Sequence, residues 1–293
     1  MSKIKMTHGE LIGKSIMSAI LIMVAVACLY PFLYVFSMSL SAPEHVLLRD
    51  VYFLPRGLGL DGYNLVFSNA NIWPAYANTL YYTVVGTAMN LLTTILAAYP
   101  LSREEFVWRR PISLMITITM FFSGGMIPFF IVVSNLGMYN TRWALIIPFA
   151  VNTWYIIVAR TFYEQLPNSL VESAKIDGAN DIYILIRIML PLSGAILSVL
   201  TLFFAVGYWN SYFWPLVFVP NPKLQPLQIF LYKILVQLKQ DLMGGVPIGI
   251  SRSVATEQFK YASIMVSILP IIAVYPFVQK YFVKGVMIGA IKG

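Results

Sequence analysis

The sequence ESAKIDGANDIYILIRIMLP, residues 172–191, is a short polar stretch between two long apolar runs. Ser169 and Glu172 have the spacing of a capping box, and Gly178 stands where a first short helix would end. Asn180 is positioned to cap a second helix that runs to Pro191. The stretch therefore predicts two short helices that meet at a sharp angle on one face of a membrane.

The composition of the chain predicts a membrane protein. Of its 293 residues, 59% are hydrophobic and 11% are charged, which is too apolar for an ordinary soluble domain. Six segments are long enough to cross a hydrocarbon core of about 30 Å as helices. They are residues 16–38, 78–100, 112–134, 143–160, 192–219 and 261–282. We expect an all-α membrane protein with six transmembrane helices and with both termini on the same side.

Lysine and arginine residues orient these spans by the positive-inside rule. They precede the first span, separate the second from the third and follow the last: Lys3, Lys5, Lys14, Arg103, Arg109, Arg110, Lys280, Lys284 and Lys292. We therefore expect both termini in the cytoplasm, together with the loop that holds Lys175. The long outer loop 219–260 also carries cations, but the rule is weaker for long loops. This topology accounts for the net charge of +8 without nucleic-acid binding.

We expect one transmembrane domain over residues 1–293. Its parts are a cytoplasmic lead-in 1–15, a first helix 16–38, a five-helix core 74–282 that contains the cytoplasmic loop 161–190, and a cytoplasmic tail 283–293. The third span contains Gly124, Gly125 and Pro128, which must weaken or bend a helix. Close helix packing through small residues and a functional hinge both explain them.

An ion-coupled secondary carrier, or an intramembrane enzyme with a regulatory cytoplasmic loop, is the alternative function class. All twelve Asp and Glu residues fall outside the expected spans. Ion-coupled carriers usually keep ionisable groups near the membrane centre. The energy for transport should then come from another chain, and we expect a transport subunit rather than an enzyme.

The polar stretch also resembles a known family. Its pattern E-x-A-x-x-D-G-A, followed by I-x-L-P, is similar to the coupling loop of binding-protein-dependent ABC importer permeases of the carbohydrate-uptake type. The resemblance implies the type I ABC importer permease fold, with a cytoplasmic coupling helix that inserts into a cleft of a separate ATPase subunit. The ATPase-coupling residues that it implies are Glu172, Ser173, Ala174, Asp177, Gly178 and Ala179. Ser173 stands where the family usually has Ala, so a small residue is kept. Helix capping alone is the plain explanation of Glu172.

Two further tracts resemble the carbohydrate permeases. Residues 121–148 are similar to the branch that imports complex oligosaccharides, and residues 207–216 match the pattern W-N-x-[FY]-x-x-P-L. Aromatic rings stack on sugar rings and amides bond their hydroxyls, so Trp209, Asn210 and Tyr212 are candidates for the substrate path. An aromatic belt at the outer interface equally explains Tyr212. Within the family, chain length and the first tract favour the smaller permeases of alginate importers.

Polar residues in or near the spans have two explanations. Hydrogen bonds between helices explain Asn78, Asn90 and Asn152, and lining of a polar cavity is the second possibility.

The resemblance also implies partners and a location. They are a second related permease in a heterodimer, two ATPase subunits that bind ATP and Mg, an extracytoplasmic solute-binding protein and an oligosaccharide substrate, in the lipid of a bacterial plasma (inner) membrane. At the tail, Lys292 and Gly293 contact the ATPase or lie near anionic lipid. We expect no cofactor in this chain, because residues 9–15 lack the spacing of a phosphate loop. Residues 57–62 spell G-x-G-x-x-G, but no strand precedes them and no helix pattern follows closely. His8 and His45 offer no spacing for a metal site.

Overall fold

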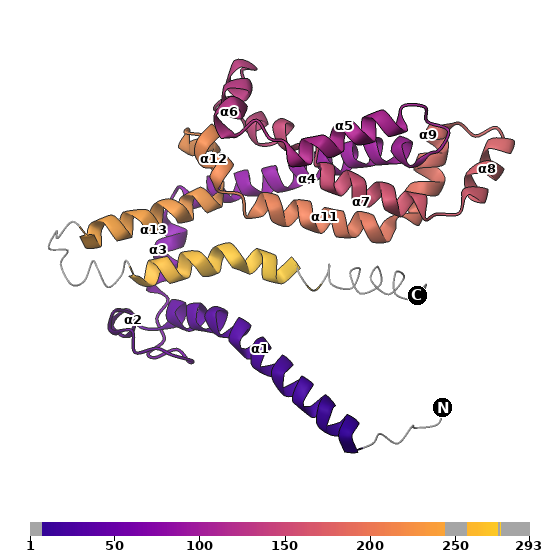
Figure 1. The fold of residues 1–293 in the computed structure, drawn as a ribbon. Helices are drawn as coiled ribbons and strands as arrows, with labels where there is room; N and C mark the ends of the chain where they lie inside the picture. The colour runs from indigo at the N-terminus through magenta and orange to yellow at the C-terminus, as the bar shows by residue number, and fades with distance from the viewer. Residues whose placement is uncertain (1–7, 244–256, 275, 277–293) are drawn as a thin grey trace. The chain divides into compact units, whose positions relative to one another are not determined.

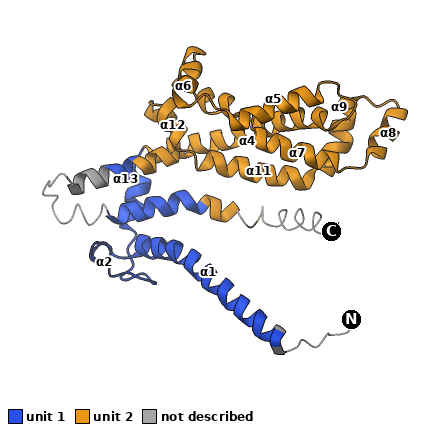
Figure 2. Ribbon diagram, viewed as in Figure 1, with its two compact units in different colours: residues 1–70, 233–269 blue, residues 71–232, 270–293 orange. Residues whose placement is uncertain are grey.

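The computed structural model describes residues 8–243, 257–274 and 276 of the chain. Within these residues the secondary structure is helical, with one isolated β-bridge between Ser41 and Leu58. The chain divides into two compact units, residues 1–70 with 233–269 and residues 71–232 with 270–293 (Figure 2). The all-α prediction is thus confirmed for the described part of the chain.

The first unit contains α1 (His8–Leu40), α2 (Pro43–Leu48), α3 (Asp61–Ser68) and most of the helix Glu257–Val274. α1 begins inside the expected lead-in and extends past the predicted bounds 16–38. Its apolar side chains are exposed over most of the helix, from Leu11 to Phe36. Such a surface requires lipid or another protein chain around it.

Gln258 joins the segments of the first unit. Its buried side-chain amide donates to the carbonyl oxygens of Ser41 and Gly59 at 2.9 Å each, and it accepts from the N–H of Gly62 at 3.0 Å. Gly62 is needed for this approach, because a Cβ there would lie 2.9 Å from Cγ of Gln258. The segment that follows α1, residues 41–70, is therefore ordered and has helices of its own.

The second unit is built around α4 (Ile72–Ser102). α7 (Thr153–Glu164) and α11 (Gly194–Trp209) pack along α4, and α5 (Arg109–Phe121) lies against α4 and α7 (Figure 1). Gly86 allows α11 to approach closely, because a Cβ at this position would lie 2.3 Å from the ring of Tyr208.

Three of the expected spans are bent pairs of helices. α5 and α6 (Met126–Asn135) are bent by 118°, and the 3-10 turns η1 (Arg142–Leu145) and η2 (Ile147–Phe149) are bent by 46° from α7. The segment Asp181–Leu192 is bent by 82° from α11. Three described helices are long and apolar enough to cross a membrane unbroken, and up to six crossings result if each bent pair is one span. Each of the six expected spans overlaps one of these within the described residues, and the fifth and sixth differ from them in their bounds.

Most of the remaining elements of the second unit are short and lie between the longer helices. α13 (Leu227–Met243) is longer and continues beyond the unit boundary. The short elements are α8 (Asn168–Ile176), α9 (Asp181–Ile184), the π-helical η3 (Leu185–Met189), α10 (Leu190–Leu192), α12 (Phe213–Phe218) and η4 (Pro222–Leu224).

Glycine produces the bend in the third span. Gly125 has φ of +82°, and a Cβ at Gly125 would meet no atom within 4 Å. Close packing within this chain therefore does not explain the glycine, whereas the left-handed backbone conformation does. The predicted bend is confirmed.

The prediction of a continuous helix over 192–219 is wrong. α11 ends at Trp209, and α12 is a separate short helix. A continuous helix would need a hydrogen bond from residue 215 to the carbonyl of Ser211, and Pro215 has no N–H to donate.

Two hydrophobic clusters occupy opposite ends of α4. One includes Tyr99 near the C-terminus of α4 and joins it to α7, α8 and α9. The other includes Tyr82 near the N-terminus of α4 and joins it to η1 and α12. Asn78 lies near this second cluster, where its amide donates to the carbonyl of Lys223 at 2.8 Å and accepts from Arg142 at 3.0 Å. The predicted bridging role of Asn78 is confirmed.

Candidate functional site

α8 carries half of the predicted coupling residues, the other half follow directly after it, and the helix is anchored from one side. Val171 and Ala174 are buried in the cluster that also contains Ile184 of α9. Glu172 and Ser173 are exposed, and Ile176 is 86% exposed. α8 is therefore held by the protein core and presents its other side outward.

The predicted end of this helix is confirmed. Gly178 has φ of +82°, and its N–H donates to the carbonyl of Lys175 at 3.0 Å. The N–H of Ala179 donates to the carbonyl of Ala174 at 2.9 Å, which completes a Schellman motif. Asn180 then caps α9, because its Oδ1 accepts from the N–H of Tyr183 at 2.8 Å.

The predicted capping box is wrong. α8 begins at Asn168, so Ser169 lies inside the first turn, and Pro167 occupies the N-cap position without a side-chain hydrogen bond. A capping box requires Ser169 itself to be the non-helical cap residue. The carboxylate of Glu172 has no hydrogen bond or ion pair to any residue that the structure describes. Capping therefore does not explain Glu172.

An ion pair attaches α8 to the loop after α4. Lys175 donates to the carboxylate of Glu105, and its Nζ lies 3.9 Å from Oδ1 of Asp181. The hydrogen bond with Glu105 is the main reason why the pKa of Lys175 is raised. Glu105 is 70% exposed, so the pair contributes at most about 1 kcal/mol. Its effect is to orient α8.

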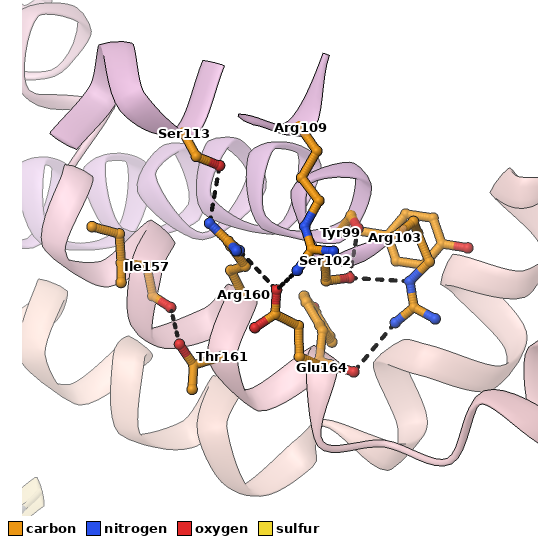
Figure 3. A network of polar contacts seen from close by, with 10 residues as sticks. Tyr99, Ser102, Arg103, Arg109, Ser113, Ile157, Arg160, Thr161 and Glu164 are labelled. Carbon is orange, nitrogen blue, oxygen red and sulfur yellow. Dashed lines mark hydrogen bonds and ion pairs between the residues drawn. The ribbon is translucent and has the colours of Figure 1, made fainter. Parts of the chain in front are cut away.

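Arginine side chains connect the neighbouring helix ends (Figure 3). Arg103 lies over the ring of Tyr99, with 5.3 Å from Cζ to the ring centroid, and donates to the carbonyl of Tyr163 at 3.2 Å. Arg109 and Arg160 both donate to Oε1 of Glu164. The positive-inside rule counted these arginines, but it did not predict that they join α4, α5 and α7.

A pocket of about 350 Å³, which we name the aromatic pocket, lies at the opposite part of the second unit. Its lining combines aromatic rings with amide and hydroxyl groups, and among the described residues no Asp, Glu, Lys, Arg or His lines it. The polar and aromatic lining residues are Tyr82, Asn90, Phe149, Asn152, Tyr155, Phe203, Phe204, Tyr208, Ser211 and Trp214.

Hydrogen bonds hold the wall of the aromatic pocket. Asn90 donates to the carbonyl of Phe149 at 3.0 Å and accepts from the hydroxyl of Tyr208 at 2.9 Å. Asn152 caps α7, because its Oδ1 accepts from the N–H of Tyr155 at 3.2 Å. Its Nδ2 donates to no residue in the described ranges. Asn90 thus fulfils both roles expected of it, and Asn152 offers a hydrogen-bond donor at the pocket.

The structure does not bring the predicted substrate-path residues together. Trp209 lines a different, mainly apolar pocket, and its ring centroid is 6.5 Å from that of Tyr76. Asn210 is exposed after the last turn of α11, and Tyr212 stacks on Tyr232 at 6.2 Å. The path through these residues stays a prediction. The predicted ATPase contacts of Lys292 and Gly293 lie outside the described residues.

Comparison with known proteins decides the family. Residues 89–288 match the model of the family described as "Binding-protein-dependent transport system inner membrane component". The chain belongs to this family. It is an inner-membrane permease of the ABC transporter type, which confirms the resemblance of its coupling loop and excludes the secondary carrier.

Relatives match the permease over nearly its whole length. It is 38% identical to the polygalacturonan/rhamnogalacturonan transport system permease protein YtcP of Bacillus subtilis, over 93% of this chain and 96% of the relative. It is 40% identical to protein LplC of the same organism, over 90% and 89%. A chain in the crystal structure of a bacterial ABC transporter involved in import of the acidic polysaccharide alginate is 36% identical, with a TM-score of 0.87 over 96% of this permease and all of that chain. The predicted permease fold is therefore confirmed.

Proposed function

We propose that this permease carries an oligosaccharide across the plasma membrane as part of an ATP-driven importer, and that α8 receives the motion of a separate ATPase. The observation that carries the proposal is the arrangement of α8. One side of α8 is fixed in the core, a Schellman motif ends α8, and Asn180 caps α9. The carboxylate of Glu172 is exposed and has no partner among the described residues.

The exposed side of α8 has the chemistry of a docking surface. Ile176 of α8 and Ile182 of the adjoining α9 are 86% and 70% exposed, so a partner would bury apolar area there. Glu172 and Asp177 would pair with cations of the ATPase, while Ser173, Gly178 and Ala179 would allow close seating. Ala174 is buried, so it would act in coupling by packing against the core.

The core would transmit the motion of α8 to the spans. Val171 packs in one cluster with Tyr99 of α4 and Ile156 of α7. Packed interiors are nearly incompressible, so these helices would move when α8 is displaced. Closing of an ATPase dimer on ATP and Mg would then switch the permease between inward-facing and outward-facing states.

The importer would contain further chains. We propose a heterodimer with a second permease, two ATPase subunits and an extracytoplasmic solute-binding protein. Arginines gather at the α8 end of the second unit, which favours a cytoplasmic position for this end and for both termini.

The aromatic pocket would contact the cargo. Rings of Tyr155 and Trp214 could stack on the apolar face of a sugar ring, and Asn152 could donate to a hydroxyl. Because no charged side chain from the described part of the chain lines it, this pocket would accept a ring face and hydroxyls rather than a carboxylate. The relative named for polygalacturonan/rhamnogalacturonan transport and the transporter involved in alginate import make acidic oligosaccharides the first substrates to test, and their carboxylates would have to be bound outside this pocket.

Glu172→Gln tests the coupling role. We expect the purified transporter to show roughly tenfold weaker ATPase association and a matching loss of transport, because a charge-assisted contact contributes about 1.5–3 kcal/mol. Glu104→Gln is the matched control, since Glu104 is exposed in the loop after α4 and has no partner in the described ranges. Oligosaccharide uptake into proteoliposomes that lack any ATPase would refute the proposal, as would equal ATPase association of both variants.

A further inference from the structure

A second pocket, which we name the arginine pocket, lies between α5 and α7. It has a volume of about 440 Å³ and is lined by Arg109, Arg110, Ser113, Leu114, Thr117 and Arg160. Coupling by α8 uses none of these side chains, and none of them lines the aromatic pocket. Their grouping needs its own explanation.

The arginine pocket has more positive than negative charge. Glu164 is shared by Arg109 and by Arg160, whose Nε lies 2.9 Å from Oε1 (Figure 3). Arg110 is exposed and has no ion pair or hydrogen bond to any other described residue. The pocket therefore has three guanidinium groups for one carboxylate, two of them paired with it, and an anion bound here would balance the excess positive charge.

The donors of the pocket suit a phosphate group. Guanidinium groups bind phosphate oxygens through paired N–H donors. Arg160 also donates to Oγ of Ser113 at 2.9 Å, and the hydroxyl hydrogen of Ser113 has no acceptor in the described part of the chain. Arg110 and Ser113 could therefore both donate to the same anion.

The surface that continues from the pocket is apolar. Leu114, Ile118 and Phe121 follow each other at spacings of four and three residues on α5, so they lie on one side of the helix. They are 63%, 46% and 78% exposed. A ligand with a phosphate head and an apolar tail would cover both the arginines and this stripe, whereas a free phosphate would leave the stripe uncovered.

We propose that the arginine pocket binds the headgroup of an anionic phospholipid in the cytoplasmic leaflet, with an acyl chain along α5. Basic pockets between transmembrane helices on the cytoplasmic side are known to bind such headgroups. The positive-inside rule accounts for cations at the cytoplasmic ends of α5 and α7, but it does not require three guanidinium groups around one pocket. The assignment to the cytoplasmic leaflet rests on the orientation proposed above, whereas the chemistry of the headgroup is inferred from the pocket alone.

The lipid would lie close to the coupling helix. α7 ends at Glu164 and α8 begins at Asn168, so only three residues separate them. A headgroup that neutralises Arg109 and Arg160 would stabilise the end of α7 and, through it, the position of α8.

Native mass spectrometry of the purified transporter with added lipid tests the proposal. We expect phosphatidylglycerol to be retained and phosphatidylcholine to be lost. Arg110→Gln should lower phosphatidylglycerol affinity about tenfold, since it removes one charge-assisted contact, and Arg110→Lys should recover part of it. Arg187→Gln is the matched control, because Arg187 is exposed, lies on η3 outside the pocket and has no partner in the described ranges.

Three results would overturn the proposal. They are equal phosphatidylglycerol affinity of Arg110→Gln and the unchanged protein, equal retention of phosphatidylcholine, or full displacement of the lipid by millimolar inorganic phosphate, which would indicate a site for a soluble anion. The measurement needs neither ATP nor sugar, so its outcome is separate from that of the proposed transport function.

Discussion

The aromatic pocket and the arginine pocket share one helix but differ in charge. Asn152 and Tyr155, at the start of α7, border the aromatic pocket, whereas Arg160 lines the arginine pocket and Glu164 pairs with its cations. The 12 residues of α7 span about 18 Å, so the helix passes from neutral hydrogen bonds to ion pairs over little more than half the thickness of a bilayer core of about 30 Å.

This difference follows from the cost of charge in a membrane. A charged side chain near the bilayer centre is expensive, while one at the interface is solvated by water and headgroups. Neutral amides and phenols such as Asn90 and Tyr208 can line a passage for a sugar without this cost. Guanidinium groups at the other end can hold helix ends and an anionic partner. One helix thus connects a region suited to cargo with a region suited to coupling.

Gly86→Ala should break the aromatic pocket and have the largest effect. The new Cβ would lie 2.3 Å from the ring of Tyr208, so this ring would have to leave its place in the pocket wall or α4 and α11 would have to separate. We expect a loss of about 1–3 kcal/mol in stability, measured by thermal unfolding, together with loss of transport. Gly194→Ala is the control, because a Cβ there meets no atom within 4 Å. A fully stable Gly86→Ala variant would contradict the described packing of α4 against α11.

Glu164→Gln should disturb the arginine pocket with a smaller effect. It removes the carboxylate shared by Arg109 and Arg160, and the partial exposure of these groups limits the cost to about 1–2 kcal/mol. Because one more positive charge is then uncompensated, we expect the loss of stability to be smaller in phosphatidylglycerol than in phosphatidylcholine. Thermal unfolding in the two lipids measures this, and identical losses would argue against an anionic ligand.

Asn152→Ser should affect only the recognition of cargo and is the mildest change. Serine keeps an N-cap acceptor for α7, so stability should change by less than about 0.5 kcal/mol. Loss of the amide donor should raise the KM for oligosaccharide transport roughly two- to tenfold, with kcat unchanged. Asn210→Ser is the comparison, and a KM increase in that variant alone would favour the path through Trp209, Asn210 and Tyr212.

Local patterns in the sequence predicted the coupling loop well. Gly178 ends α8 and Asn180 caps α9, because each of these interactions joins residues at most five positions apart. The prediction failed at Ser169, because the helix begins at Asn168 with Pro167 at the N-cap position. The bend at Gly125 was predicted, but the break after Trp209 was not, since Pro215 acts several residues beyond it.

The sequence by itself determined the helical membrane fold, the number of possible crossings and the turn residues of the coupling loop, because segment length, hydropathy and capping are local properties. Only the tertiary structure decided the two pockets. Tyr208 reaches Asn90 across 118 positions, and Arg109 reaches Glu164 across 55. A helix that is apolar on all sides carries no periodic signal for its neighbours in lipid, so these pairs follow from close packing at sites such as Gly86.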